Sequence, residues 1–113
     1  MASHSQDVKN VIDNAKVWCT KRVAVERALD GNIKRSLRIR VREKFNSLSN
    51  SGKRFDGLIY EIFTSKYGMD CYYGTPTEED WEKIKDAYEE AAGLATELLA
   101  VLNDCLRILR IHV

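Results

Sequence analysis

Residues 76–112 read PTEEDWEKIKDAYEEAAGLATELLAVLNDCLRILRIH, and this stretch decides the fold. Its apolar side chains recur three and four positions apart, which is the spacing of one helix face packed against other helices. The members of this seam are Trp81, Ile84, Tyr88, Ala91, Ala95, Leu98, Leu102, Cys105 and Leu109. The pattern predicts one amphipathic helix that runs through all 37 residues.

The start of this helix carries several independent signals. Thr75-Pro76-Thr77-Glu78 has the form of a capping box, with proline at the first helical position. Glu78, Glu79 and Asp80 follow, and carboxylates are favourable beside the positive end of a helix dipole. Gly93 is the only weak point in the interior of the predicted helix.

The length of this helix exceeds what a compact chain can cover. A helix of 37 residues is about 55 Å long, whereas a compact domain of this size has a radius of gyration of roughly 13 Å. The helix therefore breaks near Gly93, or the bundle is elongated, or the end projects and is covered by another copy. We expect an elongated bundle that forms a homo-oligomer through its C-terminal helix.

The rest of the chain predicts three more helices. The 113 residues contain one proline, and apolar residues make up 44% of them, which is typical of one folded domain covering residues 1–113. The predicted helices are about 5–30, 32–48, 53–67 and 76–112. The sequence thus predicts an all-α fold, a small elongated bundle of four helices, two of them long.

The second of these helices has an alternative interpretation as a strand. Ile33, Leu37, Val41 and Phe45 recur every four residues, as in a helix capped by Asn32. Residues 37–42 also alternate apolar and basic, which suits a strand with one basic face. A lone strand has no second alternating run to pair with, so we predict a helix. The following segment, SLSNSG at 47–52, is a loop by composition.

Charge is unevenly distributed along the sequence, although the net charge is only +1. Residues 16–54 contain twelve Lys and Arg against three acids, a balance of +9. Residues 77–104 contain nine acids against two lysines, a balance of −7. Either the two regions pack together and neutralise each other, or the basic region is a surface for a partner.

The basic region supports binding of a nucleic-acid backbone as an alternative function. In a helix, Lys34, Arg38 and Arg42 form one row, and Arg35 adjoins it. Such a row can contact successive phosphates without reading the bases. Exposed aromatic side chains that could stack on bases are scarce in residues 34–44.

Binding to another protein is the function we predict first. The last turns of the C-terminal helix carry more apolar surface than the other helices can cover, and Tyr72 and Tyr73 lie in the preceding connection. The chain is then an adaptor, an inhibitor or a small subunit of a complex. The predicted protein interface consists of Leu98, Leu99, Leu102, Leu106, Ile108, Ile111, Tyr72 and Tyr73.

Catalytic motifs are scarce, and we predict that the chain is not an enzyme. No nucleophile elbow, phosphate-binding glycine loop or HExxH motif occurs. Arg107 and His112, separated by four residues, resemble the arginine and histidine pair of HEPN-type ribonucleases, which are small helical bundles. The resemblance covers six residues, and Ile108 departs from it because a polar residue is common after the arginine. It implies cleavage of an RNA backbone, usually across a dimer.

The number and spacing of the cysteines and histidines predict neither a metal site nor a disulfide. Cys19, Cys71 and Cys105 form no CxxC pair, and the two histidines lie near the chain ends, so we expect no metal and no cofactor. We expect Cys19 and Cys105 to be core residues and Cys71, in a predicted loop, to be the most reactive thiol. Without an apolar run at the start or a stretch of ~20 apolar residues, we expect a cytoplasmic chain with no membrane partner.

Overall fold

The computed structural model describes residues 3–73 and 77–112, and helices form nearly all of this part. The five helices are α1 (Ser3–Asp30), α2 (Arg35–Asn46), α3 (Ser49–Thr64), α4 (Lys66–Tyr72) and α5 (Glu78–Leu109). The described residues contain no strand, so the segment at 37–42 is helical. The all-α class is confirmed, whereas the expected count of four helices is wrong by one.

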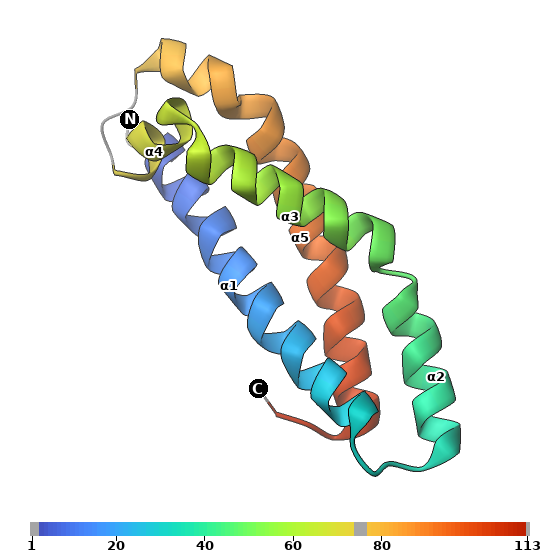
Figure 1. Ribbon diagram of the computed structural model, residues 1–113. Coiled ribbons are helices and arrows are strands. Elements are labelled where there is room, and N and C mark those ends of the chain that lie inside the picture. The colour runs from blue at the N-terminus through green and yellow to red at the C-terminus, as the bar shows by residue number, and fades with distance from the viewer. Residues whose placement is uncertain (1–2, 74–76, 113) are drawn as a thin grey trace.

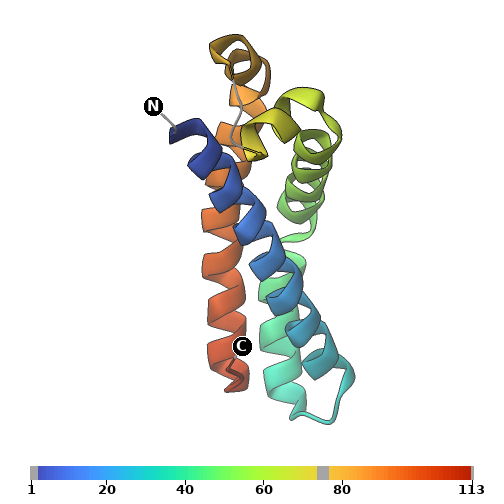
Figure 2. The same ribbon diagram turned by 90° about the vertical axis from the view of Figure 1, so that its left-hand side faces the viewer.

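The helix α5 is the central element, because each of the other four packs against it. In Figure 1, α1 runs along one side of α5, and α2 and α3 follow each other along another side. The short α4 contacts α1, α3 and α5 and closes the end where α5 begins. Figure 2 shows the same arrangement from the side.

The bundle is elongated, as the length of the C-terminal helix predicts. Its principal extents are 53 × 24 × 18 Å and its radius of gyration is 16.3 Å. Of the three ways to accommodate the long helix, the structure adopts the elongated bundle, and α5 continues through Gly93 without a break. The length of α5 is covered by α1 on one side and by α2 and α3, placed end to end, on another.

The core lies along the predicted seam of α5. Trp81, Ile84, Ala91, Ala95, Leu98, Leu102 and Cys105 are buried, whereas Tyr88 and Leu109 are partly exposed. Facing residues come from every other helix, including Val25 of α1, Val41 of α2, Phe55 of α3 and Cys71 of α4. Apolar residues spaced by three and four therefore located the core of α5 correctly.

The two ends of α5 lie inside the predicted bounds of 76–112. Thr77 is the N-cap, and its side chain accepts from the amide of Asp80, whose carboxylate accepts from the amide of Thr77. The capping box is thus Thr77 with Asp80, two residues later than expected. The expected roles of Thr75 and Pro76 lie outside the described residues. At the other end, Arg110 adopts a left-handed backbone (φ 58°) and ends the helix.

The boundary between α2 and α3 is shorter than composition predicts. Residues 47–52 were expected to be a loop, yet α3 already begins at Ser49. Leu48 is 5% exposed, and a Cβ on Gly52 would lie 3.0 Å from the Trp18 ring. The polar composition of this segment is overridden because Leu48 and Gly52 pack into the core.

The segment after α3 is a helix where a connection was expected. The chain breaks at Ser65, which is extended and whose hydroxyl accepts from the amide of Tyr67, and α4 follows. A glycine directly after the predicted helix 53–67 indicates a helix end at Gly68, but Gly68 lies within α4. A Cβ there would lie 2.1 Å from the carbonyl oxygen of Ile62, so Gly68 allows α4 to pack against α3.

Candidate interaction surfaces

The predicted interface on the C-terminal helix is largely internal. Leu98 and Leu102 are fully buried and Leu106 is 5% exposed, so these three residues pack in the core of one chain. The expectation failed for them because α1, α2 and α3 all pack against α5 and together cover this face. Leu99, Ile108 and Ile111 are partly buried at the edge of this core. Self-association through α5 stays a prediction, with a smaller surface.

The two predicted interface tyrosines belong to a larger aromatic group. Tyr73 is 70% exposed, and its ring lies 5.3 Å from that of Tyr72, which lies 6.4 Å from the ring of Phe63. Tyr60 is 71% exposed and precedes Phe63 by one helical turn. We call this group, which gathers at the end of the bundle closed by α4, the aromatic end: Tyr60, Phe63, Tyr67, Tyr72 and Tyr73.

Sequence patterning missed most of the aromatic end for an identifiable reason. On the predicted helix over 53–67, Phe63 and Tyr67 share one face with the other apolar residues, and this pattern predicts that both face the core. The break at Ser65 turns the chain, and Phe63 and Tyr67 are 43% and 37% exposed. The run of aromatic residues between 60 and 73 was the available signal.

The four residues of the predicted basic row do not all face solvent. Lys34, Arg35 and Arg42 are exposed, and Lys34 is the N-cap residue of α2 rather than part of its interior. Arg38 is partly buried, and its guanidinium donates to the carbonyls of Leu29 and Gly31. These carbonyls lie at the end of α1, where backbone acceptors lack helical partners. Arg38 is therefore committed to the α1–α2 connection.

The acidic and basic regions neutralise each other only locally. The guanidinium of Arg54 on α3 forms two bonds of 2.6 Å to the carboxylate of Glu90 on α5. This contact lowers the pKa of Glu90 and raises that of Arg54. The basic α2 lies at the opposite end of the bundle from the acidic start of α5 (Figure 1). Ion pairs between the basic residues 16–54 and the acidic residues 77–104 therefore neutralise only a small part of the charge of each region.

The arginine and histidine pair lies where α5 ends. Arg107 is exposed and pairs with Asp104 at 3.0 Å. His112 lies beyond the helix end because the amide of Ile111 donates to the carbonyl of Leu106 after the left-handed Arg110. Both side chains line one cleft, but His112 is not on α5 as expected. Whether the pair has a catalytic role stays untested.

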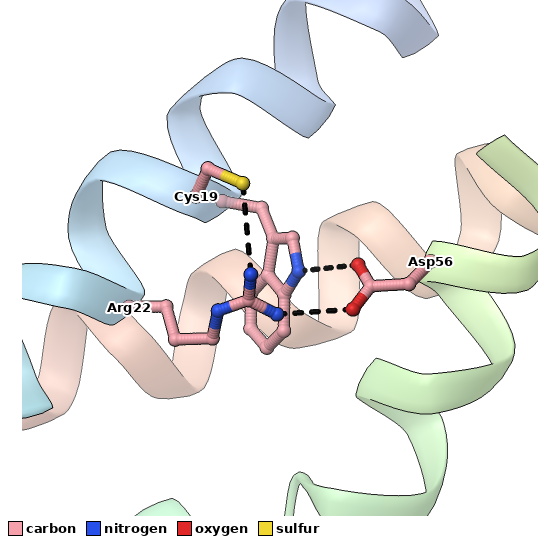
Figure 3. Close-up of polar contacts among 4 residues, drawn as sticks. Cys19, Arg22 and Asp56 are labelled. Atoms are coloured by element: carbon pink, nitrogen blue, oxygen red, sulfur yellow. Dashed lines mark hydrogen bonds and ion pairs between the residues drawn. The ribbon is translucent and has the colours of Figure 1, made fainter. Parts of the chain in front are cut away.

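A polar cluster joins α1 to α3 at mid-length of the bundle (Figure 3). The indole N–H of Trp18 donates to one carboxylate oxygen of Asp56 at 2.9 Å, and Arg22 donates to the other at 3.0 Å. The Arg22 guanidinium also lies 4.9 Å from the centre of a Trp18 ring and contacts the Cys19 sulfur at 3.6 Å. A cleft of about 300 Å³ adjoins the cluster.

This cluster explains why an arginine interrupts the apolar pattern of α1. Arg22 stands where the three-and-four spacing of this helix calls for an apolar residue, and the sequence predicts that it either extends along the edge of the apolar stripe or meets an acid of the last helix. It meets an acid of α3 instead, and its guanidinium covers the indole of Trp18. Because one carboxylate accepts from both side chains, the cluster fixes how α1 sits on α3.

The three cysteines differ from expectation in two cases. Cys71 lies within α4 and is fully buried, and Cys19 is exposed. Cys105 is buried as expected, and burial raises the pKa of both Cys71 and Cys105. The accessible thiol is therefore that of Cys19.

Comparison of the chain with protein-family models, curated proteins and solved structures gave no match. Within residues 3–73 and 77–112, no group of three or more His, Cys, Asp and Glu side chains is placed to hold a metal ion. None of the described helices combines the length and apolar content that a membrane span requires.

Proposed function

We propose that this chain is a non-enzymatic protein-interaction module that binds its partner through the aromatic end. One observation carries the proposal. Five of the ten aromatic residues gather on α3, α4 and the residue after α4, and Tyr60 and Tyr73 are more than two-thirds exposed. Exposed aromatic groups of this kind are enriched at protein interfaces, where they supply large contact areas at low entropic cost.

Folding alone does not account for these side chains. Tyr60 lies on the outer face of α3, where a polar residue serves the fold equally well, and the ring of Tyr73 contacts only that of Tyr72 among the ring contacts of the described residues. Phe63 has no polar atom to offset its exposure to water. Coverage by a partner would remove this surface from water.

The surroundings of the aromatic end favour a basic partner. Residues 56–92, which form most of α3, α4 and the first half of α5, contain ten acids and three lysines, a net charge of −7. A partner segment with apolar side chains among Lys and Arg would complement both properties, and the charge would speed its encounter.

The test is site-specific photo-crosslinking in the cells that make the protein. A photoreactive phenylalanine analogue at Tyr73 should capture one protein with a basic contact segment, and Tyr60→Ser with Phe63→Ser should abolish the adduct. The same analogue at Val23, an exposed apolar residue of α1, is the matched control. Equal adducts at both positions, or no adduct at Tyr73, would contradict the proposal. Adducts between two copies of the chain would reassign the surface to self-association.

A further inference from the structure

Two clefts meet at the opposite end of the bundle, where α5 ends. The α2–α5 cleft has a volume of about 730 Å³, and its charged lining residues are Lys34, Arg40, Arg107 and Arg110. The α1–α5 cleft has a volume of about 720 Å³ and is lined by Lys21, Arg107, Arg110 and His112, among others. Neither lining includes an Asp or a Glu. Because the clefts share Arg107 and Arg110, their cations form one continuous basic surface.

Most of these cations are available to a ligand. None of the ion pairs found among the described residues involves Lys34, Arg40 or Arg110. Arg107 pairs with Asp104, and the ammonium of Lys21 donates to the amide oxygen of Asn103. Within residues 3–73 and 77–112, three of the five Lys and Arg side chains therefore have no anionic partner, and Lys21 donates to a neutral group.

The backbone of Arg110 is a second, independent observation about this surface. Arg110 has φ 58°, in the region where glycine is favoured because it lacks a Cβ. An arginine at this position costs stability relative to glycine, so folding does not account for the side chain. A cation is favourable near the negative end of a helix, but Arg107 already supplies one. Arg110 therefore adds a positive charge to the lining of both clefts.

The acidic residues around the aromatic end are too far away to neutralise this basic surface. Residues 18–54 contain eleven Lys and Arg against three acids, a net charge of +8 in the half of the bundle that includes α2. The long axis of the molecule is 53 Å, whereas charges in water are screened over about 8 Å at physiological ionic strength. A ligand at this end therefore encounters an essentially cationic surface.

We infer that this basic surface binds the phosphate backbone of a nucleic acid without reading its bases. Arginine guanidinium groups match phosphate oxygens in geometry, and cations spread over two adjoining clefts suit a chain of repeated anions better than a single anion. Neither cleft is lined by Phe, Tyr or Trp, so the larger aromatic rings on which bases stack are absent from both linings. This site lies at the end of the bundle opposite the aromatic end, so the inference is independent of the proposed function.

The test measures binding of a fluorescent single-stranded oligonucleotide of mixed sequence to the full chain by anisotropy at several salt concentrations. With four or five phosphates contacted, the slope of log affinity against log salt should be about −3. Arg40→Gln with Arg110→Gly should weaken binding at least tenfold at low salt. The second change suits the left-handed backbone, so the helix end is retained, and circular dichroism checks the fold.

The control removes the same charge elsewhere. Lys9→Gln with Lys83→Gln, both exposed and outside the clefts, should leave the affinity within twofold. The inference is overturned if no binding is seen at low salt or if this control weakens binding as much as the cleft variant. Poly-glutamate of equal charge that binds as tightly as the oligonucleotide would also overturn it, and would indicate a site for an acidic protein segment.

Discussion

Gly68 and Gly93 both lie inside helices, but their surroundings differ completely. A Cβ at Gly68 would lie 2.1 Å from the Ile62 carbonyl oxygen, and that atom belongs to the backbone of α3. A Cβ at Gly93 would meet no atom within 4 Å. The sequence predicts a helix end at Gly68 and a weak point inside a helix at Gly93, and it gives no sign of the close contact at Gly68, since that contact depends on a neighbouring helix.

The first prediction compares alanine at these two positions. Gly68→Ala should lower the free energy of unfolding by about 1–3 kcal/mol, because α4 must move away from α3. Gly93→Ala should raise it by about 1 kcal/mol, because alanine is the better helix former. Urea denaturation followed by circular dichroism measures both. Equal effects of the two changes would show that α4 does not pack closely on α3.

The second prediction concerns the Trp18–Asp56 contact. Trp18→Phe keeps most of the ring packing but removes the N–H donor, and Asp56→Ala removes the acceptor shared with Arg22. Each should destabilise the fold by about 1 kcal/mol, a modest value because Asp56 is half exposed. Their combination should cost less than the sum of the two, since both remove one bond. Strict additivity would mean that the bond does not contribute to stability.

The third prediction uses the cysteines as probes of burial. An alkylating reagent at neutral pH should modify Cys19 rapidly, and Cys71 and Cys105 only when the chain unfolds. Burial raises the pKa of these two thiols above 9.0, whereas an unfolded chain ionises them near that value. The unfolded chain therefore loses these thiol protons at a lower pH than the folded chain does, and the free energy of unfolding should fall as the pH rises above about 9. Mass spectrometry in buffer and in urea counts the modified thiols, and rapid labelling of Cys71 in buffer would refute the buried α4.

At the scale of elements, the predictable features were those that depend on periodicity. The seam of α5 and the helical form of α2 follow from apolar spacing, which acts along one helix. The start of α3 at Ser49 and the existence of α4 depend instead on contacts of Leu48, Gly52 and Gly68 with other helices. Those contacts are absent from local sequence patterns, so the segments were assigned to loops.

The fourth prediction concerns the connection between α1 and α2. Arg38→Gln should destabilise the fold by about 1–2 kcal/mol, because the carbonyls of Leu29 and Gly31 lose their donor at the end of α1. Arg42→Gln, an exposed change of the same charge on the same helix, should alter stability by less than about 0.5 kcal/mol. The two variants compared by thermal unfolding separate the capping role from the charge. Similar losses in both would indicate a general charge effect.

At the scale of the whole molecule, the main property is the separation of charge along the bundle axis. Both candidate surfaces depend on it, since the aromatic end carries acids and the end of α5 carries cations. Charge counts along the sequence predicted the segregation, but only the topology decides whether the two regions meet. They meet only at local contacts such as Arg54–Glu90, because α2 packs on the second half of α5 and most of the acidic residues occupy the first half.

The fifth prediction follows from this separation. Like charges repel within each end, and the repulsion is larger in the folded chain than in the expanded unfolded one. Salt shortens the screening length from about 30 Å at 0.01 M to about 8 Å at 0.15 M, so the free energy of unfolding should rise over this range by about 1 kcal/mol or less. Urea titrations at the two salt concentrations measure the change.

A charge variant tests the cause of that rise. Glu82→Lys with Glu89→Lys changes two exposed acids of α5 beyond its first turn, where the helix dipole favours carboxylates, and lowers the repulsion within the acidic half of α5. This variant should be more stable than the natural sequence at 0.01 M salt and should gain less from added salt, because less repulsion is left to screen. A decrease of stability with salt would instead mean that favourable ion pairs such as Arg54–Glu90 outweigh the repulsion. The separated charges would then not lower the free energy of unfolding. Charge separation would in that case support the two proposed partners less strongly.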